Sequence, residues 1–283
     1  MRIKYSGLID NHEKFQKQGW LWLNSLICLA KINPADIFVH CVKGTSEEYI
    51  KKCAQTGANI EITEPYGDKK YCNKIAQMSN AKLKDADAVV LMDTDMIMLD
   101  NFEDTIDFNS ISSKIVNAPN PDLSVIDELF ALADMKKSIP DRIIELAHDY
   151  PEHTMTYGAN FNGGLYIIPQ KYFDIVKSGW EKWAQWMLKN GKPLYDAKKE
   201  MHIDQLSFCM TVHENNLPLT YLSRLYNYPL PFDFGDPDRI PYVIHYHFHT
   251  DENHLLWINY EPQENMKKAL EISNEFILKH TKI

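Results

Sequence analysis

The sequence predicts one α/β domain with a mostly parallel central sheet and helices on both faces, and three observations support this fold class. The chain has 283 residues, enough for one full core but short for two generous domains. Strand-like and helix-like segments alternate from the N-terminus in the order βαβαβ, which favours parallel strands joined by right-handed crossovers. Residues 88–92, AVVLM, form a continuous apolar run, typical of a strand that helices cover on both faces.

The first half of the chain has the clearest element boundaries. Asn33-Pro34 ends the first helix, because the residue before a proline disfavours the α conformation. Where apolar residues are bounded by polar or turn-forming ones, strands are expected at residues 2–8, 37–42, 59–63 and 88–92. Where apolar residues recur near helical spacing, helices are expected at residues 13–31, 45–56 and 70–81.

The second half is less regular. The strand at 164–168 or the one at 242–248 is expected to be an antiparallel addition to the sheet. In chain order we expect a strand at 115–118, a helical insertion at 122–148, a strand at 164–168, a tryptophan-rich helix at 171–189, a short helix from Ile203, a proline-rich loop at 226–241, a strand at 242–248 and a last helix at 263–280.

Composition and charge exclude several classes of function. The formal net charge is -9 at pH 7, which argues against binding nucleic acid through its phosphates. The chain has no run of about 18 apolar residues and no apolar leader after Met1, so we expect no transmembrane segment and a cytoplasmic protein, either free or peripheral to a membrane. The five cysteines lack C-x-x-C spacing and predict neither disulfides nor a thiolate zinc site.

The first chemical feature is Asp93-Thr94-Asp95, which directly follows the apolar run at 88–92. Ligands of open parallel sheets bind outside the carboxyl ends of the strands, where these carboxylates are expected. Carboxylate oxygens suit Mg²⁺ or Mn²⁺, which proteins hold with one or two carboxylates plus substrate phosphates. A turn cap beside a solvated acid is one alternative, since D-x-D is common. The haloacid dehalogenase-type phosphatases are another, but their pair follows the first strand, whereas three expected strands precede this one.

Paired glycines and an acid at a helix start come later in the chain. Gly163 and Gly164 follow Asn162 and open an apolar strand, where the missing Cβ atoms let a ligand approach the backbone. A structural turn explains the glycines equally. Asp204-Gln205 opens a helix, where the alternative role of the acid is to cap the helix N-terminus.

Three histidines, His245, His247 and His249, follow one another at strand spacing. On one face of a strand they would form a zinc site, so a zinc-type metalloenzyme is an alternative reading of the chain. The common dinucleotide and P-loop fingerprints are absent, because neither G-x-G-x-x-G nor G-K-[ST] occurs. A nucleotide, if bound, therefore needs a different kind of site.

The order of these motifs resembles that of the GT-A glycosyltransferases, most closely the family-eight branch with its glycogenin-like and bacterial galactosyltransferase-like enzymes. The matching features are Asp93-Thr94-Asp95 after a strand, the loop at 161–164, Asp204-Gln205, and a late strand bearing His245. The resemblance implies a GT-A (Rossmann-like) fold in one domain. It divides residues 1–283 into a nucleotide-binding half at 1–100, a sugar and acceptor half at 101–260 and a C-terminal helix at 261–283.

The resemblance also implies roles for single residues. Mn²⁺ or Mg²⁺ would bind beside the donor diphosphate, with the ligands Asp93, Asp95 and His245. The residues expected to contact the donor are Asp93, Lys74, Asn162, Gly163 and Gly164. The residues expected to act in catalysis, beside the transferred sugar, are Asp204 and Gln205.

The implied activity is the metal-dependent transfer of a hexosyl or pentosyl group from a nucleotide-sugar to a glycan or other hydroxyl acceptor, as in polysaccharide biosynthesis. A UDP-sugar is the expected donor. A retaining reaction is favoured, because Asp204-Gln205 together with the loop at 161–164 is similar to the pattern of retaining enzymes in that branch. An inverting transferase is the alternative. The Lys-Pro-Trp that usually follows the metal histidine is absent between His245 and Trp257. A nucleotide-sugar-binding protein without turnover is a further alternative.

Overall fold

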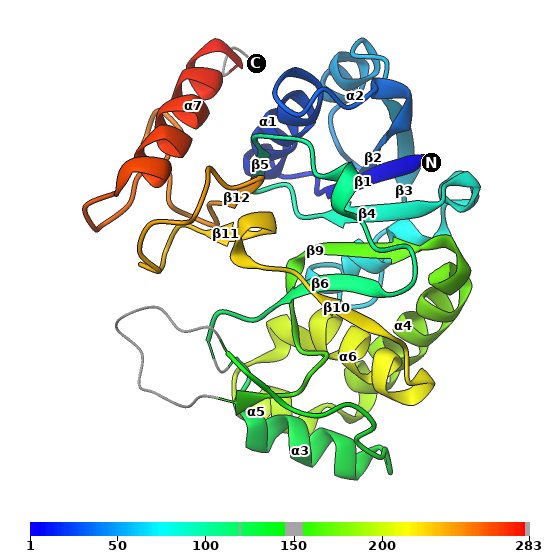
Figure 1. Cartoon of the computed structure of the whole chain (residues 1–283). Coiled ribbons are helices and arrows are strands. Elements are labelled where there is room, and N and C mark those ends of the chain that lie inside the picture. The colour runs from blue at the N-terminus through cyan, green and yellow to red at the C-terminus, as the bar shows by residue number, and fades with distance from the viewer. Residues whose placement is uncertain (119, 145–154, 281–283) are drawn as a thin grey trace.

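A seven-stranded sheet forms the centre of the described part of the molecule (Figure 1). The computed structural model describes residues 1–118, 120–144 and 155–280. Across the sheet the strands are β10 (Leu219–Tyr221), β6 (Ile111–Ile115), β9 (Phe161–Pro169), β4 (Ala88–Met92), β1 (Ile3–Ile9), β2 (Ile37–Val42) and β3 (Asn59–Thr63). The β4-β1-β2-β3 half is parallel throughout, whereas β9 runs antiparallel to both of its neighbours.

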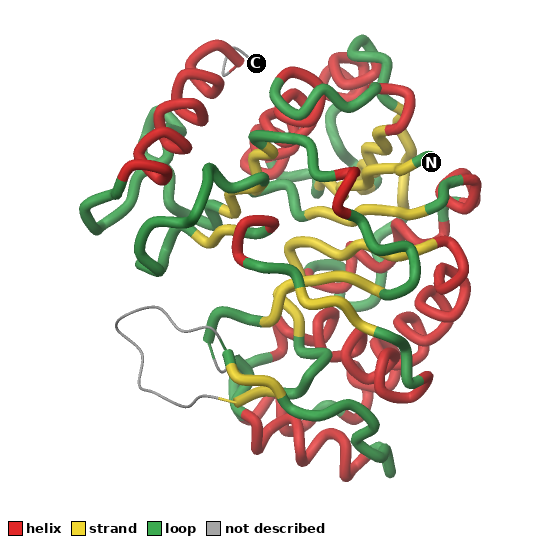
Figure 2. The backbone as a smooth tube through the Cα atoms, in the orientation of Figure 1, coloured by secondary structure: helices red, strands yellow, loops and turns green. Residues whose placement is uncertain are grey.

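Helices cover both faces of this sheet, as Figure 2 shows. On one face lie α4 (Gln170–Asn190), α6 (Ile203–Asn215) and the 3-10 segment η2 (Tyr71–Ser79). On the other lie α1 (Glu13–Cys28) and α2 (Glu47–Ala54). The position of β4 between the two layers of helices explains why its sequence is apolar throughout. Val89 and Leu91 belong to the core under α4 and α6, whereas Val90 and Met92 belong to the core under α1.

A small second sheet lies at the carboxyl end of β4. It contains β11 (Tyr228–Pro229), β12 (Val243–His245) and β5 (Met96–Met98), with β12 antiparallel to β5. In that pairing His245 lies opposite Met96. This register places the late histidine next to the end of the Asp93-Thr94-Asp95 segment, far away in the sequence.

The remaining elements surround these two sheets. Helix α7 (Glu264–His280) packs against the small second sheet through a shared buried apolar cluster, which contains Ile97, Ile244 and Phe276. These elements are α3 (Leu123–Leu132), the hairpin of β7 (Arg142–Ile143) and β8 (Met155–Thr156), α5 (Lys192–Asp196) and α7 (Glu264–His280). Among the described residues, no helix combines the length and apolar character needed to cross a membrane.

The fold class predicted from the sequence is confirmed, and so are the strands at 37–42, 59–63 and 88–92. Of the two alternative antiparallel additions to the central sheet, the one at 164–168 occurs, since β9 pairs antiparallel with β4; β12 pairs antiparallel with β5 in the small second sheet instead. Helices α1, α2, α4, α6 and α7 also begin or end within a few residues of the predicted bounds.

Four predicted elements are wrong in type or extent. The segment 70–81 forms 3-10 turns instead of an α-helix, and the strand expected at 115–118 is β6, which ends at Ile115. The insertion at 122–148 is helical only to Leu132; residues 145–148 lie outside the described residues. The strand expected at 242–248 ends at His245, because His247 has a left-handed backbone with φ 52° that a strand cannot continue through.

The crossing of α4 and α6 depends on Gly179. A Cβ built there lies 2.4 Å from Cγ2 of the buried Thr211. Alanine normally stabilises a helix by about 1 kcal/mol over glycine, but overpacking typically costs about 1–3 kcal/mol. We therefore expect Gly179→Ala to lower the free energy of unfolding in urea, although helix propensity alone predicts the opposite.

The control for Gly179→Ala is a second substitution that removes the atom with which the added Cβ clashes. Thr211→Ala deletes Cγ2, so the double variant should lose less stability than the sum of the two single variants. A stabilised Gly179→Ala protein would show that the two helices do not pack as tightly as the structure indicates.

Candidate functional site

The two carboxylates of Asp93-Thr94-Asp95 emerge where β4 ends and β5 begins. Backbone hydrogen bonds hold both acids: Asp93 N donates to Gly164 O (2.8 Å), and Tyr246 N donates to Asp95 O (3.1 Å). The segment is therefore fixed between β9 on one side and the end of β12 on the other. Thr94 is buried, so the two flanking carboxylates lie at the carboxyl edge of the parallel strands.

Lys74, from the 3-10 segment η2, joins three of the predicted site residues. Its Nζ lies 2.7 Å from Asp93 Oδ1 and 3.3 Å from Asp204 Oδ2, and it donates to Gly163 O at 3.1 Å. Burial lowers the pKa of Lys74, but the two carboxylates outweigh burial and raise it, so the amine stays charged. Burial raises the pKa of Asp204, and Lys74 opposes that rise only in part.

Asp204 and Gln205 lie in the first turn of α6, which begins at Ile203. The structure therefore does not place Asp204 at the N-cap position, where His202 stands. The Trp180 indole donates to Asp204 O at 2.7 Å and holds the start of the helix. Gln205 Nε2 donates to Asn160 Oδ1 at 2.6 Å, so the amide of Gln205 is held by a fully buried side chain.

The second group of ligand-type side chains contains Asp95, His245 and His247. One ligand atom from each lies within 4.8 Å of the others, and His245 Nε2 lies 3.2 Å from Asp95 Oδ1. Burial raises the pKa of Asp95, but the neighbouring His245 and His247 hold it well below its usual range. Burial and the adjacent His245 lower the pKa of His247 to about 3, so His247 is neutral near pH 7 and its ring has a free lone pair.

A relay of amides fixes the tautomer of His245. Gly164 N donates to Asn162 Oδ1 (3.0 Å), which identifies that atom as the acceptor. Asn227 Nδ2 donates to the same oxygen at 3.0 Å, so Asn227 must turn its own Oδ1 toward His245 Nδ1, 3.0 Å away. Nδ1 of His245 therefore carries a hydrogen, and Nε2 is the ring nitrogen that faces the Asp95 carboxylate, as a donor when the ring is protonated and as a possible metal ligand when it is neutral.

A neutral Nε2 at this distance from a carboxylate needs a cation between the two atoms, whereas a protonated Nε2 donates to the carboxylate directly. The site of Asp95, His245 and His247 meets that requirement for a divalent metal, since its donors are oxygen and imidazole nitrogen and the histidine is oriented by a hydrogen-bonded amide. The three-histidine zinc site considered from the sequence does not form: His249 lies outside this group, and its ring packs on Trp257 with centroids 4.5 Å apart.

The structure therefore divides the predicted site residues into two neighbouring groups. The first, the Lys74 group, contains Lys74, Asp93, Asp204 and Gly163. The second, the Asp95 group, contains Asp95 and His245 together with His247. Asp93 is not among the three clustered ligand atoms, because its Oδ1 pairs with Lys74. A role for Asp93 in binding the metal stays a prediction.

Sequence reasoning missed three residues that shape these groups: Asn160, Asn227 and His247. Asn160 directly precedes the loop at 161–164, and no pattern in the sequence gives it a role. Asn227 lies at the start of a proline-rich segment, and no pattern there indicates that it contacts a histidine. His247 was visible in the histidine series, but strand spacing does not predict the left-handed turn that brings it beside His245.

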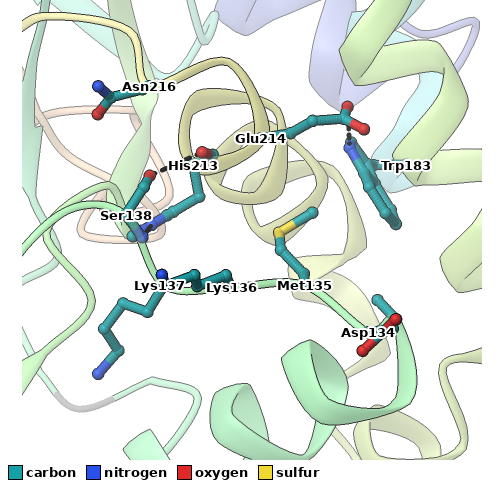
Figure 3. Close-up of a pocket in the computed structure, with 10 residues that line it drawn as sticks. Asp134, Met135, Lys136, Lys137, Ser138, Trp183, His213, Glu214 and Asn216 are labelled. Atoms are coloured by element: carbon teal, nitrogen blue, oxygen red, sulfur yellow. Dashed lines mark hydrogen bonds between the residues drawn. The ribbon is translucent and has the colours of Figure 1, made fainter.

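A cavity of about 640 Å³ lies elsewhere, between the segment after α3 and the end of α6 (Figure 3). Its lining includes Lys137, Ser138 and His213, and it shares no residue with the two groups above. His213 is held by the backbone of the facing segment: its Nδ1 accepts from Ser138 N at 3.2 Å, and its carbonyl accepts from Ser138 Oγ at 2.7 Å. The polar atoms that His213 turns to this wall thus stabilise the fold, and the cavity receives no role in the function proposed below.

Comparison with known proteins identifies the fold. No protein-family model matches the chain, and no curated protein matches it in sequence. Among solved structures, the galactosyltransferase LgtC in complex with donor and acceptor sugar analogs matches with a TM-score of 0.52 and 14% identity, over 99% of this chain and 97% of that chain. A structure of an active-site glutamine-to-glutamate mutant of LgtC matches with a TM-score of 0.55 and 14% identity, over the same shares.

A third match is the glycosyltransferase GlyE of Streptococcus pneumoniae TIGR4, with a TM-score of 0.53 and 13% identity, over 98% of this chain and 62% of that chain. Likeness at such low identity defines the fold. The chain has the GT-A fold of glycosyltransferases, as the order of its motifs predicts.

Gly164 gives a test of the site geometry. A Cβ built there lies 2.6 Å from His245 Cε1 and 2.6 Å from Met96 Cε, so something must shift. We expect Gly164→Ala to cost about 1–3 kcal/mol of stability and to weaken divalent-metal binding, because the His245 ring is displaced from Asp95. Thermal unfolding and a Mn²⁺ titration measure the two effects.

Gly163→Ala is the matched control. The atom nearest to its added Cβ is Lys74 Nζ, which lies 3.2 Å away at the end of a flexible side chain. This variant should therefore keep most of its stability and its Mn²⁺ affinity. Equal metal binding by the two alanine variants would contradict the close approach of β9 to His245.

Proposed function

We propose that this protein is a glycosyltransferase that transfers a hexosyl or pentosyl group from a nucleotide-sugar to a glycan or other hydroxyl acceptor. The donor that we favour is a UDP-sugar. The main support for this proposal is that the Lys74 group and the Asp95 group are neighbours at the carboxyl edge of the sheet in a GT-A fold. This edge is where open parallel sheets bind ligands. LgtC, which shares the fold, is described in complex with donor and acceptor sugar analogs.

The donor would lie across the two groups. Asp95 and His245, with Asp93 nearby, would hold Mn²⁺ or Mg²⁺ next to the diphosphate; Lys74, Asn162, Gly163 and Gly164 would line the sugar side. A divalent metal offsets the charge that develops on a nucleoside diphosphate leaving group. The negatively charged chain needs such a cation, since its net charge of -9 does not itself attract an anionic donor. On this proposal residues 1–100 form the nucleotide-binding half, and 101–260 form the sugar and acceptor half.

Asp204 and Gln205 would act beside the transferred sugar. Lys74 keeps Asp204 paired at 3.3 Å, and Asn160 fixes the amide of Gln205, so neither side chain has to reorganise during the reaction. We favour retention of anomeric configuration, because Asp204-Gln205 together with the loop at 161–164 is similar to the pattern of retaining enzymes in the family-eight branch. LgtC, which shares the fold, also has a glutamine in its active site, which supports the placement of Gln205 at the site proposed here.

Removal of Asp95 tests the metal-dependent chemistry. Asp95→Ala should abolish Mn²⁺-dependent hydrolysis of UDP-glucose and UDP-galactose without lowering the unfolding temperature, since the side chain contributes a ligand and little packing. Chelation of the wild type should give the same loss, and added Mn²⁺ should reverse it. Full activity of Asp95→Ala would remove the proposed role of the carboxylate.

Asp100→Ala is the control for that variant. Asp100 lies just beyond β5, pairs with Arg239 at 2.7 Å on the surface, and takes no part in the site. An exposed pair of this kind contributes about 0–1 kcal/mol, so the variant should keep both its fold and its hydrolytic activity.

The stereochemical course is tested by product NMR and by Asp204→Asn. We expect an α-linked product from an α-linked donor, and a fall in kcat of less than about 10²-fold in Asp204→Asn, because a positioned general base contributes roughly 10²–10⁴-fold. A β-linked product together with a larger fall would instead assign an inverting reaction with Asp204 as base. The fold and the metal site would be unaffected by that result.

A further inference from the structure

The backbone at His247 brings a second imidazole to the Asp95 group. In a regular strand, residues two positions apart are separated by roughly 6.7 Å. The rings of His245 and His247 are stacked with centroids only 3.7 Å apart, because His247 takes a left-handed conformation with φ 52°. Such a conformation is unfavourable for a residue other than glycine and is retained where the surroundings require it.

The three donor atoms have the spacing of ligands to one small ion. Metal ions of this class hold oxygen and nitrogen ligands at about 2.0–2.2 Å, so adjacent ligands lie about 3 Å apart and opposite ones about 4.2 Å. His245 Nε2 lies 3.2 Å from Asp95 Oδ1, and all three atoms lie within 4.8 Å of one another. Because the lone pair of an imidazole lies in the plane of its ring, binding of one ion by both rings also requires the stacked pair, whose planes are 29° apart, to open.

Among the described residues, this group contains one carboxylate and two imidazoles. Asp93 pairs with Lys74 at 2.7 Å, which leaves Asp95 as the carboxylate of the cluster. Imidazole suits transition ions such as Fe²⁺, Ni²⁺ and Zn²⁺ best. Mn²⁺ is the weakest binder of that series but still accepts nitrogen beside oxygen ligands, whereas Mg²⁺ prefers oxygen and gives up its water reluctantly.

We infer that His247 is a third protein ligand of the metal, and that the resulting set of one carboxylate and two imidazoles selects Mn²⁺ and other transition ions over Mg²⁺. This inference rests on the metal dependence within the proposed function. The proposed function requires a divalent ion at this site, but it requires neither His247 as a ligand nor a preference for Mn²⁺ over Mg²⁺.

The test uses the full chain without nucleotide and with Mn²⁺ alone as the probe. Electron spin echo spectroscopy of bound Mn²⁺ detects the ¹⁴N nuclei of coordinated imidazoles. We expect two coupled imidazoles in the wild type and one in His247→Ala. Mn²⁺ affinity should fall by roughly tenfold or more in that variant. Competition with Mg²⁺ should show a clear preference for Mn²⁺ in the wild type that is reduced in the variant.

His254→Ala is a matched control, because His254 is also a left-handed histidine of the same segment, with φ 64°, but lies outside the cluster. Its spectrum and affinity should equal those of the wild type. One coupled imidazole in the wild type would overturn the inference even if His247→Ala failed to fold. Unchanged Mn²⁺ binding by a folded His247→Ala would overturn it too.

The outcomes separate this inference from the proposed function. Failure of the proposed function would appear as a protein that binds Mn²⁺ with two imidazoles but neither binds nor hydrolyses a UDP-sugar. Failure of the inference would appear as turnover of a UDP-sugar with a single coupled imidazole and with equal Mn²⁺ affinity in His247→Ala.

Discussion

The contact between Asp95 and His245 is the constraint around which the proposed site is built. The amide relay through Asn162 and Asn227 turns Nε2 of His245 toward a carboxylate 3.2 Å away, an arrangement that accepts either a proton on the ring or a metal ion between the two atoms. The relay starts at a backbone amide of β9, so the orientation of this imidazole depends on the central sheet itself. Binding of a metal and integrity of the fold are thereby linked at one position.

The same sheet holds the second group of site residues. Asp93 hydrogen-bonds through its backbone to Gly164, and Lys74 places one amine between Asp93, Asp204 and the carbonyl of Gly163. A charged amine between two carboxylates compensates for their mutual repulsion at a partly buried edge. On the proposed function, one group would be arranged around a fixed lysine and the adjacent group around a divalent ion, a division of charge that suits an anionic donor.

Much of the fold was predictable because its signals are local. The apolar run of β4 and the acids that follow it predict a buried strand with ligands at its carboxyl end. The contact of His245 with Asp95 depends instead on β5 and β12, each only three residues long, whose pairing joins distant parts of the chain. Asn227 and the left-handed turn at His247 have no sequence signal, because a single side-chain contact or a single φ angle leaves no periodic pattern.

A structure of the protein with UDP and Mn²⁺ tests the central claim most directly. The account predicts the ion between Asp95 and His245, within ligand distance of His247, with the diphosphate completing its shell at the carboxyl ends of β1 and β4. A nucleotide bound at the opposite edge of the sheet, or an ion held away from both Asp95 and His245, would contradict it.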